Sequence, residues 1–380
     1  MRKILLIMGL VVSNLLAYAQ TDTIVVNDTV TTMHWNLYNF AGVNTTANPT
    51  RMASIRAVLK YVKPDVFTIN ELQSAQAADN LLAQCLNTQG ETRYRRATYI
   101  AGNDTECMLF YRSDKYRLEL ATSISSTPRD IYKYKLYYIP SGGADFLTTD
   151  SVYATYYVVH PKASNTPADE AERTVTANSI MSDVRGSVAD ANYKHFFLHG
   201  DLNVYSNTAA SYVAYTTPAL RRTFRDVMNN SWARINYTQS PRNRQFDGGV
   251  NGGLDDRFDF ILQSPDVISG TGGSMRIIPT SYRAIGNDGT NFDGTDLNSR
   301  ANTVYPDSVV NGVFFGSDHL PVSTKYQVKK RVVCPRLAQP EIIISAANDS
   351  LFSTTTGRTY IWTYNGNVLP QTGRRIGVVG

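Results

Sequence analysis

The segment Lys194-His195-Phe196-Phe197-Leu198-His199-Gly200-Asp201-Leu202-Asn203 joins a short apolar run to a polar end. Residues 194–198 are typical of a buried strand, and the Gly-Asp-Leu-Asn sequence ends it. A carboxylate and an amide then stand where loops on a rigid scaffold usually carry functional residues. The segment therefore predicts a sheet whose edge carries a chemical site.

The same arrangement recurs along the chain. Further strands are predicted at residues 29–37, 66–69, 151–159, 258–262 and 309–315. Each carries or precedes polar side chains, which are in order Asn36, Asn70 with Glu71, His160, Asp259, and Asp318 with His319. Polar residues from several strand ends that cluster in space would form one site.

Strands are the more frequent predicted elements in the rest of the chain, and helices lie between some of them. Helices are expected at residues 50–62, with Thr50 as the cap, at 75–86 and at 168–188. The third has acidic residues near its start, which suits the positive end of a helix dipole. More strands are expected at residues 94–100, 106–111, 132–139 and 320–328.

The polar residues suit the hydrolysis of a phosphate ester. That reaction needs a cation against the phosphoryl oxygens, a group that positions water, and stabilisation of the leaving oxygen. Magnesium and calcium prefer oxygen ligands, which are supplied by Asn36, Glu71, Asp201, Asn203 and Asp318. A histidine can hydrogen-bond or protonate a phosphate oxygen near neutral pH, and His160 and His319 both directly follow predicted strands.

Three other polar residues have two interpretations each. Asp259 in an aromatic strand needs a partner, either a histidine whose second nitrogen it orients or Arg257 on the same strand face. His34 shares the strand face of Asn36, so a supporting role near the site stays open. We expect His195 and His199 to be structural.

Six motifs in order resemble those of the endonuclease/exonuclease/phosphatase superfamily. They are Trp35-Asn36, Asn70-Glu71, His160-Pro161-Lys162-Ala163, Gly200-Asp201-Leu202-Asn203, Arg257-Phe258-Asp259 and Ser317-Asp318-His319-Leu320-Pro321-Val322. Each motif alone is weak, whereas six in order are specific. The superfamily includes pancreatic-type deoxyribonucleases, abasic-site endonucleases, bacterial sphingomyelinases and inositol-polyphosphate 5-phosphatases. The run from His160 to Ala163, followed by Arg173, resembles bacterial members of unassigned substrate more than the mammalian nucleases.

The resemblance implies a four-layer α/β sandwich, in which two mostly antiparallel sheets pack face to face with helices outside. It implies Glu71 as the principal ligand of Mg²⁺, or of Ca²⁺ or Mn²⁺, with Asn36 nearby and Asp318 at the metal or the water. It also implies that Asp201 and Asn203 orient water and phosphate, that Asp259 holds His319, and that His160 flanks the phosphate. Lys162 and Arg173 would contact the substrate phosphate. The implied reaction is a direct in-line attack by water.

The ends of the chain predict export and an appended module. Residues 1–19 have a basic start, an apolar run and a small-residue end, which is typical of a cleaved signal peptide. The apolar run is shorter than the roughly 20 residues of a membrane span, so we expect a protein that is secreted or held at the outer surface. We also expect it to be a monomer. Residues 20–330 would form the catalytic domain, and residues 331–380 a small β-rich module, complete or truncated, similar to immunoglobulin- or PKD-like domains.

Composition does not select the substrate. The formal net charge of +5 falls to +3 without Arg2 and Lys3, because 35 basic residues then face 32 acidic ones, and this is too weak to indicate nucleic acid. Cys85, Cys107 and Cys334 have no zinc-like spacing. A nuclease is the leading hypothesis. The alternatives are a phosphomonoesterase or phospholipid phosphodiesterase, acting on inositol phosphates or sphingomyelin-like lipids, and an inactive surface binding protein.

Two segments could distinguish a nuclease from a lipid-cleaving enzyme. The arginines of the insertion could follow a nucleic acid backbone or lie on a solvated surface; they are Arg221, Arg222, Arg225, Arg234, Arg242 and Arg244. The tyrosine-rich residues 131–138 could form a core strand or an exposed platform for lipid.

Overall fold

The computed structural model describes residues 21–139, 147–148, 151–187, 194–217, 222–271, 273–292 and 294–335, together with short strands between residues 342 and 377. The chain divides into two compact units, one of residues 25–331 and one of residues 1–24 with 332–380. The predicted signal peptide, residues 1–19, lies outside the described residues. Within the described part, no helix has both the length and the apolar character that a bilayer span requires.

The first sheet of the larger unit has a parallel pair near its centre. Strands β1 and β2 run parallel, while β2 with β4, β3 with β4, and β11 with β13 are antiparallel. The order is β11 (Met275–Ile277), β13 (Val322–Pro335), β1 (Thr21–Phe40), β2 (Val66–Leu72), β4 (Glu106–Arg112) and β3 (Tyr94–Arg96), with β12 (Arg283–Ala284) and β7 (Leu147–Thr148) also paired to β13.

The second sheet repeats this plan. Strands β8 and β9 run parallel, and their neighbours are antiparallel. The order is β10 (Asp259–Gln263), β9 (Phe196–Asp201), β8 (Tyr153–Val159), β6 (Ile131–Tyr138) and β5 (Tyr116–Ile124). Strand β5 was not predicted, because it lies at the sheet edge, where charged residues such as Arg117 and Glu119 interrupt its apolar pattern.

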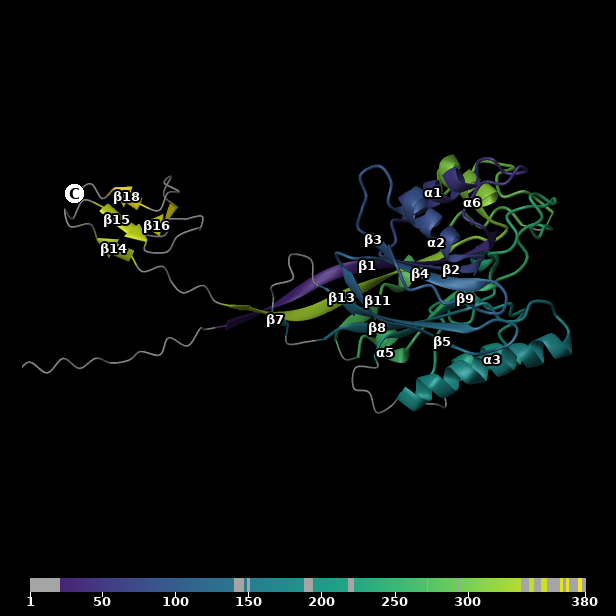
Figure 1. Ribbon diagram of the computed structural model, residues 1–380, viewed down its shortest axis with the longest axis horizontal. Coiled ribbons are helices and arrows are strands. Elements are labelled where there is room, and N and C mark those ends of the chain that lie inside the picture. Colours follow the sequence, from purple (N-terminus) through teal and green to yellow (C-terminus); the bar gives the residue numbers. More distant parts are fainter. Residues whose placement is uncertain are drawn as a thin grey trace, which may run out of the picture. The chain divides into compact units, whose positions relative to one another are not determined.

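Helices cover the outer faces of both sheets (Figure 1). The first sheet carries α1 (Arg51–Val62), α2 (Ala75–Leu81) with the π-helical turn η1 (Leu82–Leu86), and α6 (Asp307–Gly316). The second carries α3 (Pro167–Gly186) and α4 (Ala210–Thr216), and the short helix α5 (Pro265–Ser269) and the 3₁₀ turns η3 (Arg234–Asn236) and η4 (Pro279–Ser281) lie in connections. Helices outside two mostly antiparallel sheets confirm the predicted four-layer α/β sandwich.

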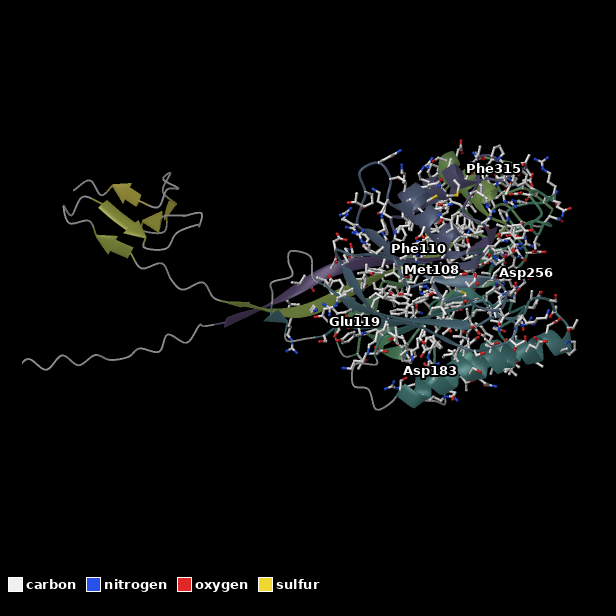
Figure 2. The ribbon with its side chains drawn as sticks, viewed as in Figure 1. Met108, Phe110, Glu119, Asp183, Asp256 and Phe315 are labelled. Carbon is white, nitrogen blue, oxygen red and sulfur yellow. The ribbon has the colours of Figure 1, made fainter. Side chains whose placement is uncertain are left out.

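Aromatic side chains join the two sheets in the core. The rings of Phe197 on β9 and Tyr326 on β13 lie 5.1 Å apart across the interface between the sheets. In Figure 2, Met108 and Phe110 lie on β4 within the body of the unit, whereas Asp183 lies on the outer helix α3. The face-to-face packing of two pleated sheets therefore fixes their strand ends relative to each other.

The expected strand at residues 309–315 is wrong, because this segment lies in the helix α6. A short apolar run does not distinguish a buried strand from a buried helix. Gly312 lets α6 approach α1 closely, since a Cβ atom there would lie 2.9 Å from the Ser54 carbonyl oxygen. His319 therefore follows a helix and not a strand. Thr50 does stand at the start of α1, but its side chain makes no capping hydrogen bond.

The smaller unit contains short strands. The three strands β14 (Ile342–Ile344), β15 (Ser350–Ser353) and β18 (Arg375–Gly377) form an antiparallel sheet, and β16 (Thr363–Tyr364) pairs with β17 (Asn367–Val368). The assignment of residues 331–380 to an immunoglobulin- or PKD-like module stays a prediction.

Candidate active site

The two parallel strand pairs bring four of the predicted residues together. In the first sheet Asn36 lies on β1 beside Asn70 of β2, and Glu71 follows Asn70. In the second sheet His160 directly follows β8, and Asp201 ends the neighbouring strand β9. Each sheet therefore contributes two of these four side chains.

Asp201 lies at the centre of the group and is 2% exposed. Its Oδ2 accepts a hydrogen bond from Asn36 Nδ2 at 3.0 Å, and its backbone N–H donates to Asn70 Oδ1 at 2.9 Å. The Nε2 atoms of His160 and His319 lie 3.5 and 3.6 Å from the same Oδ2. One carboxylate oxygen thus faces an amide and two imidazoles.

Glu71 is turned toward Asp201 by an irregularity in β2. Its φ is +59°, in the left-handed region that few non-glycine residues adopt, and the register of β2 shifts between Ile69 and Leu72. Glu71 Oε1 accepts from Asn36 Nδ2 at 2.9 Å, and Oε2 accepts from the Asn39 N–H at 2.8 Å. Backbone strain of this kind is common at functional sites, where surrounding contacts hold it.

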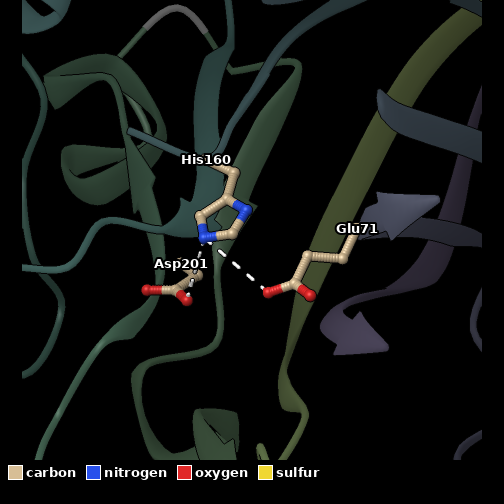
Figure 3. Close-up of side chains that lie close together, drawn as sticks. All are labelled: Glu71, His160 and Asp201. Carbon is tan, nitrogen blue, oxygen red and sulfur yellow. Dashed lines mark ion pairs between the residues drawn. The ribbon is translucent and has the colours of Figure 1, made fainter. Parts of the chain in front are cut away.

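Glu71, His160 and Asp201 form a possible metal site (Figure 3). One ligand atom from each lies within 4.8 Å of the others. Burial lowers the pKa of His160 to about 3, although the charge of Asp201 opposes the shift. A neutral imidazole and two carboxylates fit a divalent cation, because a ligand nitrogen must be unprotonated and two negative charges balance the ion. Asn36 donates to both carboxylates and thereby holds them together.

His319 is held both through its ring and through its backbone. Its Nδ1 lies 2.7 Å from Asp259 Oδ2, and its backbone carbonyl accepts from Trp35 Nε1 at 2.8 Å. Burial opposes protonation, but the charges of Asp259 and Asp201 outweigh it and hold the pKa of His319 well above its ordinary value. Of the two partners that the sequence allowed for Asp259, the structure selects the histidine, since Arg257 pairs with Asp226 at 2.7 Å.

The Gly-Asp-Leu-Asn turn has a clear physical basis. A Cβ atom at Gly200 would lie 2.2 Å from the Val159 carbonyl oxygen, so only glycine fits between β8 and β9. Asn203 has a φ of +50° and donates its backbone N–H to Asp201 Oδ1 at 3.1 Å. Its Nδ2 lies 3.4 Å from the Pro161 carbonyl oxygen. Asn203 therefore links Asp201 to the loop after His160.

Asp318 makes contacts on another side of the site. Its Oδ2 accepts from the Val250 N–H at 2.8 Å, and a Cβ atom at Gly249 would lie 2.8 Å from the Asp318 Cβ. Among the described residues, the group that could share one ion does not include Asp318. These contacts hold the 249–250 loop, and the predicted role of Asp318 at the metal or water stays a prediction.

The two predicted phosphate-binding residues differ in their surroundings. Arg173 is 1% exposed, and its guanidinium donates to Glu170 and to the carbonyl oxygens of Lys162 and Ser164 at 2.8, 2.8 and 2.6 Å. Lys162 is partly exposed and pairs with Asp169 at 3.2 Å. Arg173 thus holds the loop that follows His160, and a phosphate contact by either residue stays a prediction.

Gln239 is a site residue that the sequence did not reveal. Its side-chain amide lies 2.6 Å from His319 Nε2, on the side of the ring that faces Asp201. It belongs to the irregular insertion before β10, where neither periodicity nor a motif marks it. His34, whose supporting role was left open, lies with its Nε2 3.8 Å from Asp259 Oδ1.

Comparison with known proteins agrees with this geometry. The model of the endonuclease/exonuclease/phosphatase family matches residues 33–319, which include every predicted site residue. A search of curated proteins gives no match.

Solved structures of similar fold include an endonuclease/exonuclease/phosphatase family protein from Bacteroides thetaiotaomicron, which is 16% identical, with 80% of this chain and 96% of that chain covered and a TM-score of 0.51. TDP2 from C. elegans is 16% identical, with 78% and 75% covered and a TM-score of 0.50. TDP2 from D. rerio, complexed with a single-strand DNA product, is 11% identical, with 78% and 98% covered and a TM-score of 0.50.

Enzymes of this family are hydrolases that act on phosphate esters with divalent metals. The described residues place the six sequence motifs around one buried carboxylate, as such chemistry requires. The chain therefore belongs to the endonuclease/exonuclease/phosphatase family and is a metal-dependent hydrolase of phosphate esters.

Proposed function

We propose that this protein is a nuclease, which cleaves phosphodiester bonds by direct in-line attack of water. The proposal rests on the position of Asp201 between the Nε2 atoms of His160 and His319, at 3.5 and 3.6 Å. A carboxylate so placed can take a proton from water, while the imidazoles face the oxygens of a bound phosphate.

The electrostatics of the site suit these roles. Burial raises the pKa of Asp201, against the charges of His319 and His160. A carboxylate with a raised pKa is a better base near neutral pH than an ordinary one. His319 has a raised pKa and Asp259 beside it, so we assign to it the stabilisation of phosphoryl charge. Asn203, which donates to Asp201, would position water and phosphate.

Glu71 would hold the cation, with Asn36 and Asp318 as further candidate ligands, which leaves Asp201 and His160 for the base and phosphate roles assigned above. A bound divalent cation supplies positive charge against the phosphoryl and leaving oxygens. Carboxylate and amide oxygens suit Mg²⁺, Ca²⁺ and Mn²⁺.

Two observations favour nucleic acid over phospholipid as the substrate. Tyr132, Tyr134 and Tyr138 of β6 are buried, so residues 131–138 form a core strand and provide no lipid platform. The D. rerio TDP2 structure, which has a similar fold, is complexed with a single-strand DNA product.

The arginines of the insertion give limited support. Arg242 is buried and donates to the Phe314 and Phe246 carbonyl oxygens at 2.9 Å, so it cannot follow a substrate backbone. Arg244 is 76% exposed, with Asp296 at 3.7 Å. Arg221 lies outside the described residues.

We also propose that the protein is exported and is released or held at the outer surface, because residues 1–19 have the three-part pattern of a signal peptide. N-terminal sequencing of the protein from its native cell tests this. A start at Gln20 is expected, and an intact Met1 would contradict export by this route.

The function is tested by hydrolysis of single- and double-stranded DNA, RNA, bis-p-nitrophenyl phosphate, p-nitrophenyl phosphate, sphingomyelin and inositol phosphates. Each is incubated with Mg²⁺, Mn²⁺ or Ca²⁺, and with a chelator. Two variants accompany the native chain. His319→Ala removes the imidazole beside Asp201, and His195→Ala removes another buried imidazole, which contacts the Tyr153 carbonyl oxygen.

We expect metal-dependent cleavage of DNA or RNA. The His319→Ala substitution should reduce this activity by at least about a hundredfold. The folded His195→Ala variant should keep it. Cleavage of sphingomyelin or of phosphomonoesters with no cleavage of nucleic acid would refute the nuclease assignment. Equal activity of the two variants would refute the assigned role of His319.

A further inference from the structure

Buried polar side chains continue behind the pair formed by Asp259 and His319. His34 on β1 and Thr68 on β2 are register partners in the first sheet. His199 on β9 contacts Thr68 from the second sheet. The three side chains are each 0% exposed. Buried polar groups are costly unless they are hydrogen-bonded, so their partners define what the cluster does.

The contacts form a line that leads to the active site. Thr68 Oγ1 lies 2.9 Å from His199 Nδ1 and 3.0 Å from His34 Nδ1. On the other side of its ring, His34 Nε2 faces Asp259 Oδ1 at 3.8 Å. Both of these facing atoms are buried and without a hydrogen-bond partner among the described residues. The gap is too short for a bridging water and closes to hydrogen-bond length with a shift of about 0.8 Å.

The number of available protons determines which atom donates in each of these hydrogen bonds. Burial lowers the pKa of His199 to about 3 and that of His34 well below its ordinary value, so each ring carries one N–H near neutral pH. The Thr68 hydroxyl has one proton to donate. If His199 Nδ1–H donates to Thr68, the hydroxyl can donate to His34 Nδ1, and the proton of His34 must then lie on Nε2.

The alternative directions leave buried groups in conflict. If His34 carried its proton on Nδ1, the lone pair of Nε2 would face the Asp259 carboxylate. If Thr68 donated to His199, or to the Met33 carbonyl oxygen at 3.4 Å, His34 Nδ1 would receive no hydrogen bond from it, whereas His199 Nε2 has no described partner in either direction. An unpaired buried donor or acceptor costs about 1–3 kcal/mol. Only the direction from His199 to Asp259 both gives His34 Nδ1 a donor and turns an N–H toward the Asp259 carboxylate.

We propose that His34 is a positioning residue, which donates from Nε2 to Asp259 Oδ1 and is itself oriented by Thr68 and His199. Asp259 then accepts from His34 with one oxygen and from His319 Nδ1 with the other, at 2.7 Å. This arrangement keeps a proton on His319 Nδ1 and the ring plane fixed, so that Nε2 faces Asp201. The inference rests on the proposed hydrolytic role of His319.

The Thr68 hydroxyl offers a sharp test. Thr68→Val keeps the side-chain shape and removes the hydroxyl, whereas Thr68→Ser keeps the hydroxyl. Thr155→Val is the matched control, because Thr155 is also a buried strand threonine and its hydroxyl has no described partner. Long-range ¹H–¹⁵N spectra of the full chain, without added metal, report which ring nitrogens of His34 and His319 carry protons.

We expect Nε2–H at His34 and Nδ1–H at His319 in the native chain, Thr68→Ser and Thr155→Val. In Thr68→Val we expect His34 Nδ1 to lose its hydrogen bond, which should shift its ¹⁵N signal, and the Nδ1–H signal of His319 to weaken because the His34 ring is no longer held. With bis-p-nitrophenyl phosphate, kcat should fall about tenfold in Thr68→Val with little change in KM, because partners behind a catalytic group typically change activity by that amount. Thr68→Ser should restore it.

Unchanged ring-nitrogen signals of His34 and His319 together with an unchanged kcat in Thr68→Val would overturn the proposal, even with a loss of thermal stability. Nδ1–H at His34 in the native chain would overturn it also. If the native chain hydrolyses no phosphate ester, the proposed function fails, and the spectra still decide separately whether the directed line of hydrogen bonds exists.

Discussion

Lys162 and Arg173 were both predicted to contact phosphate, and at the residue scale they should behave differently. Arg173→Met should lower the free energy of unfolding by about 3 kcal/mol, because it leaves Glu170 and two carbonyl oxygens without their donor. Lys162→Met should leave stability nearly unchanged and raise KM about tenfold, if the lysine makes a charge-assisted phosphate contact. Urea unfolding and steady-state kinetics measure the two effects. An unchanged KM for Lys162→Met would remove this residue from the substrate site.

Asp256 provides a pH-dependent prediction. Burial and the charges of Asp255 and Asp201 raise the pKa of Asp256 to about 6 from 3.8. A raised pKa means that the fold favours the protonated form, so its stabilisation is complete below pH 3.8 and is lost as the pH rises through about 6. Asp256→Asn should therefore be more stable than the native chain at pH 8, by about 1 kcal/mol after allowance for partial exposure, and about equally stable at pH 4.

Thermal unfolding at the two pH values checks this prediction, with Asp256→Glu as the control that keeps the charge. The difference between Asp256→Asn and the native chain should grow from pH 4 to pH 8. A difference that is constant with pH would show that the carboxylate does not titrate in this range.

At the scale of elements, the contact between α1 and α6 sets the position of His319. Gly312→Ala should destabilise the fold by about 2 kcal/mol, since its Cβ atom would lie 2.9 Å from Ser54 O and Val58 Cγ2. Gly186→Ala near the end of α3 is the control, because a Cβ atom there meets nothing within 4 Å and alanine favours helix by up to about 1 kcal/mol. Urea unfolding should show opposite signs for the two, and equal effects would mean that the close approach is not limiting.

Elements differ in how well the sequence predicts them. The strands that deliver Asn36, Glu71, His160 and Asp201 are apolar and end in polar residues, so their pattern is readable. Residues 309–315 are equally apolar, and a short buried helix cannot be distinguished from a strand by periodicity. The close contact of Gly312 with α1 is tertiary and has no signal in the local sequence.

The site residues that belong to the six motifs could be predicted from the sequence. Each of the six motifs has a recognisable order in the chain, and the structure brings Asp259 to His319 and Asp201 to His160. Gln239 lies in an irregular loop, and the line from His199 to Asp259 depends on the packing of two sheets, so neither has a local pattern. What escaped prediction are contacts between distant segments without a periodic signal.

At the scale of the whole molecule, every predicted site residue lies within the unit of residues 25–331. A chain that ends at Pro335 should therefore keep kcat/KM for a small diester within about twofold of the full chain, because a domain with its own core can act alone. Kinetics of both chains with bis-p-nitrophenyl phosphate test this. A large loss, with the shortened chain folded, would assign a role in catalysis to residues 336–380.

The hydrogen bond from Trp35 Nε1 to the His319 carbonyl joins residues 284 positions apart, and each sheet supplies its own part of the centre. Contacts between such distant segments form late, because loop closure must precede them. A nascent or partly unfolded chain therefore has no complete catalytic centre, however much secondary structure it contains. A hydrolase of phosphate esters built in this way stays inactive until its last strands dock.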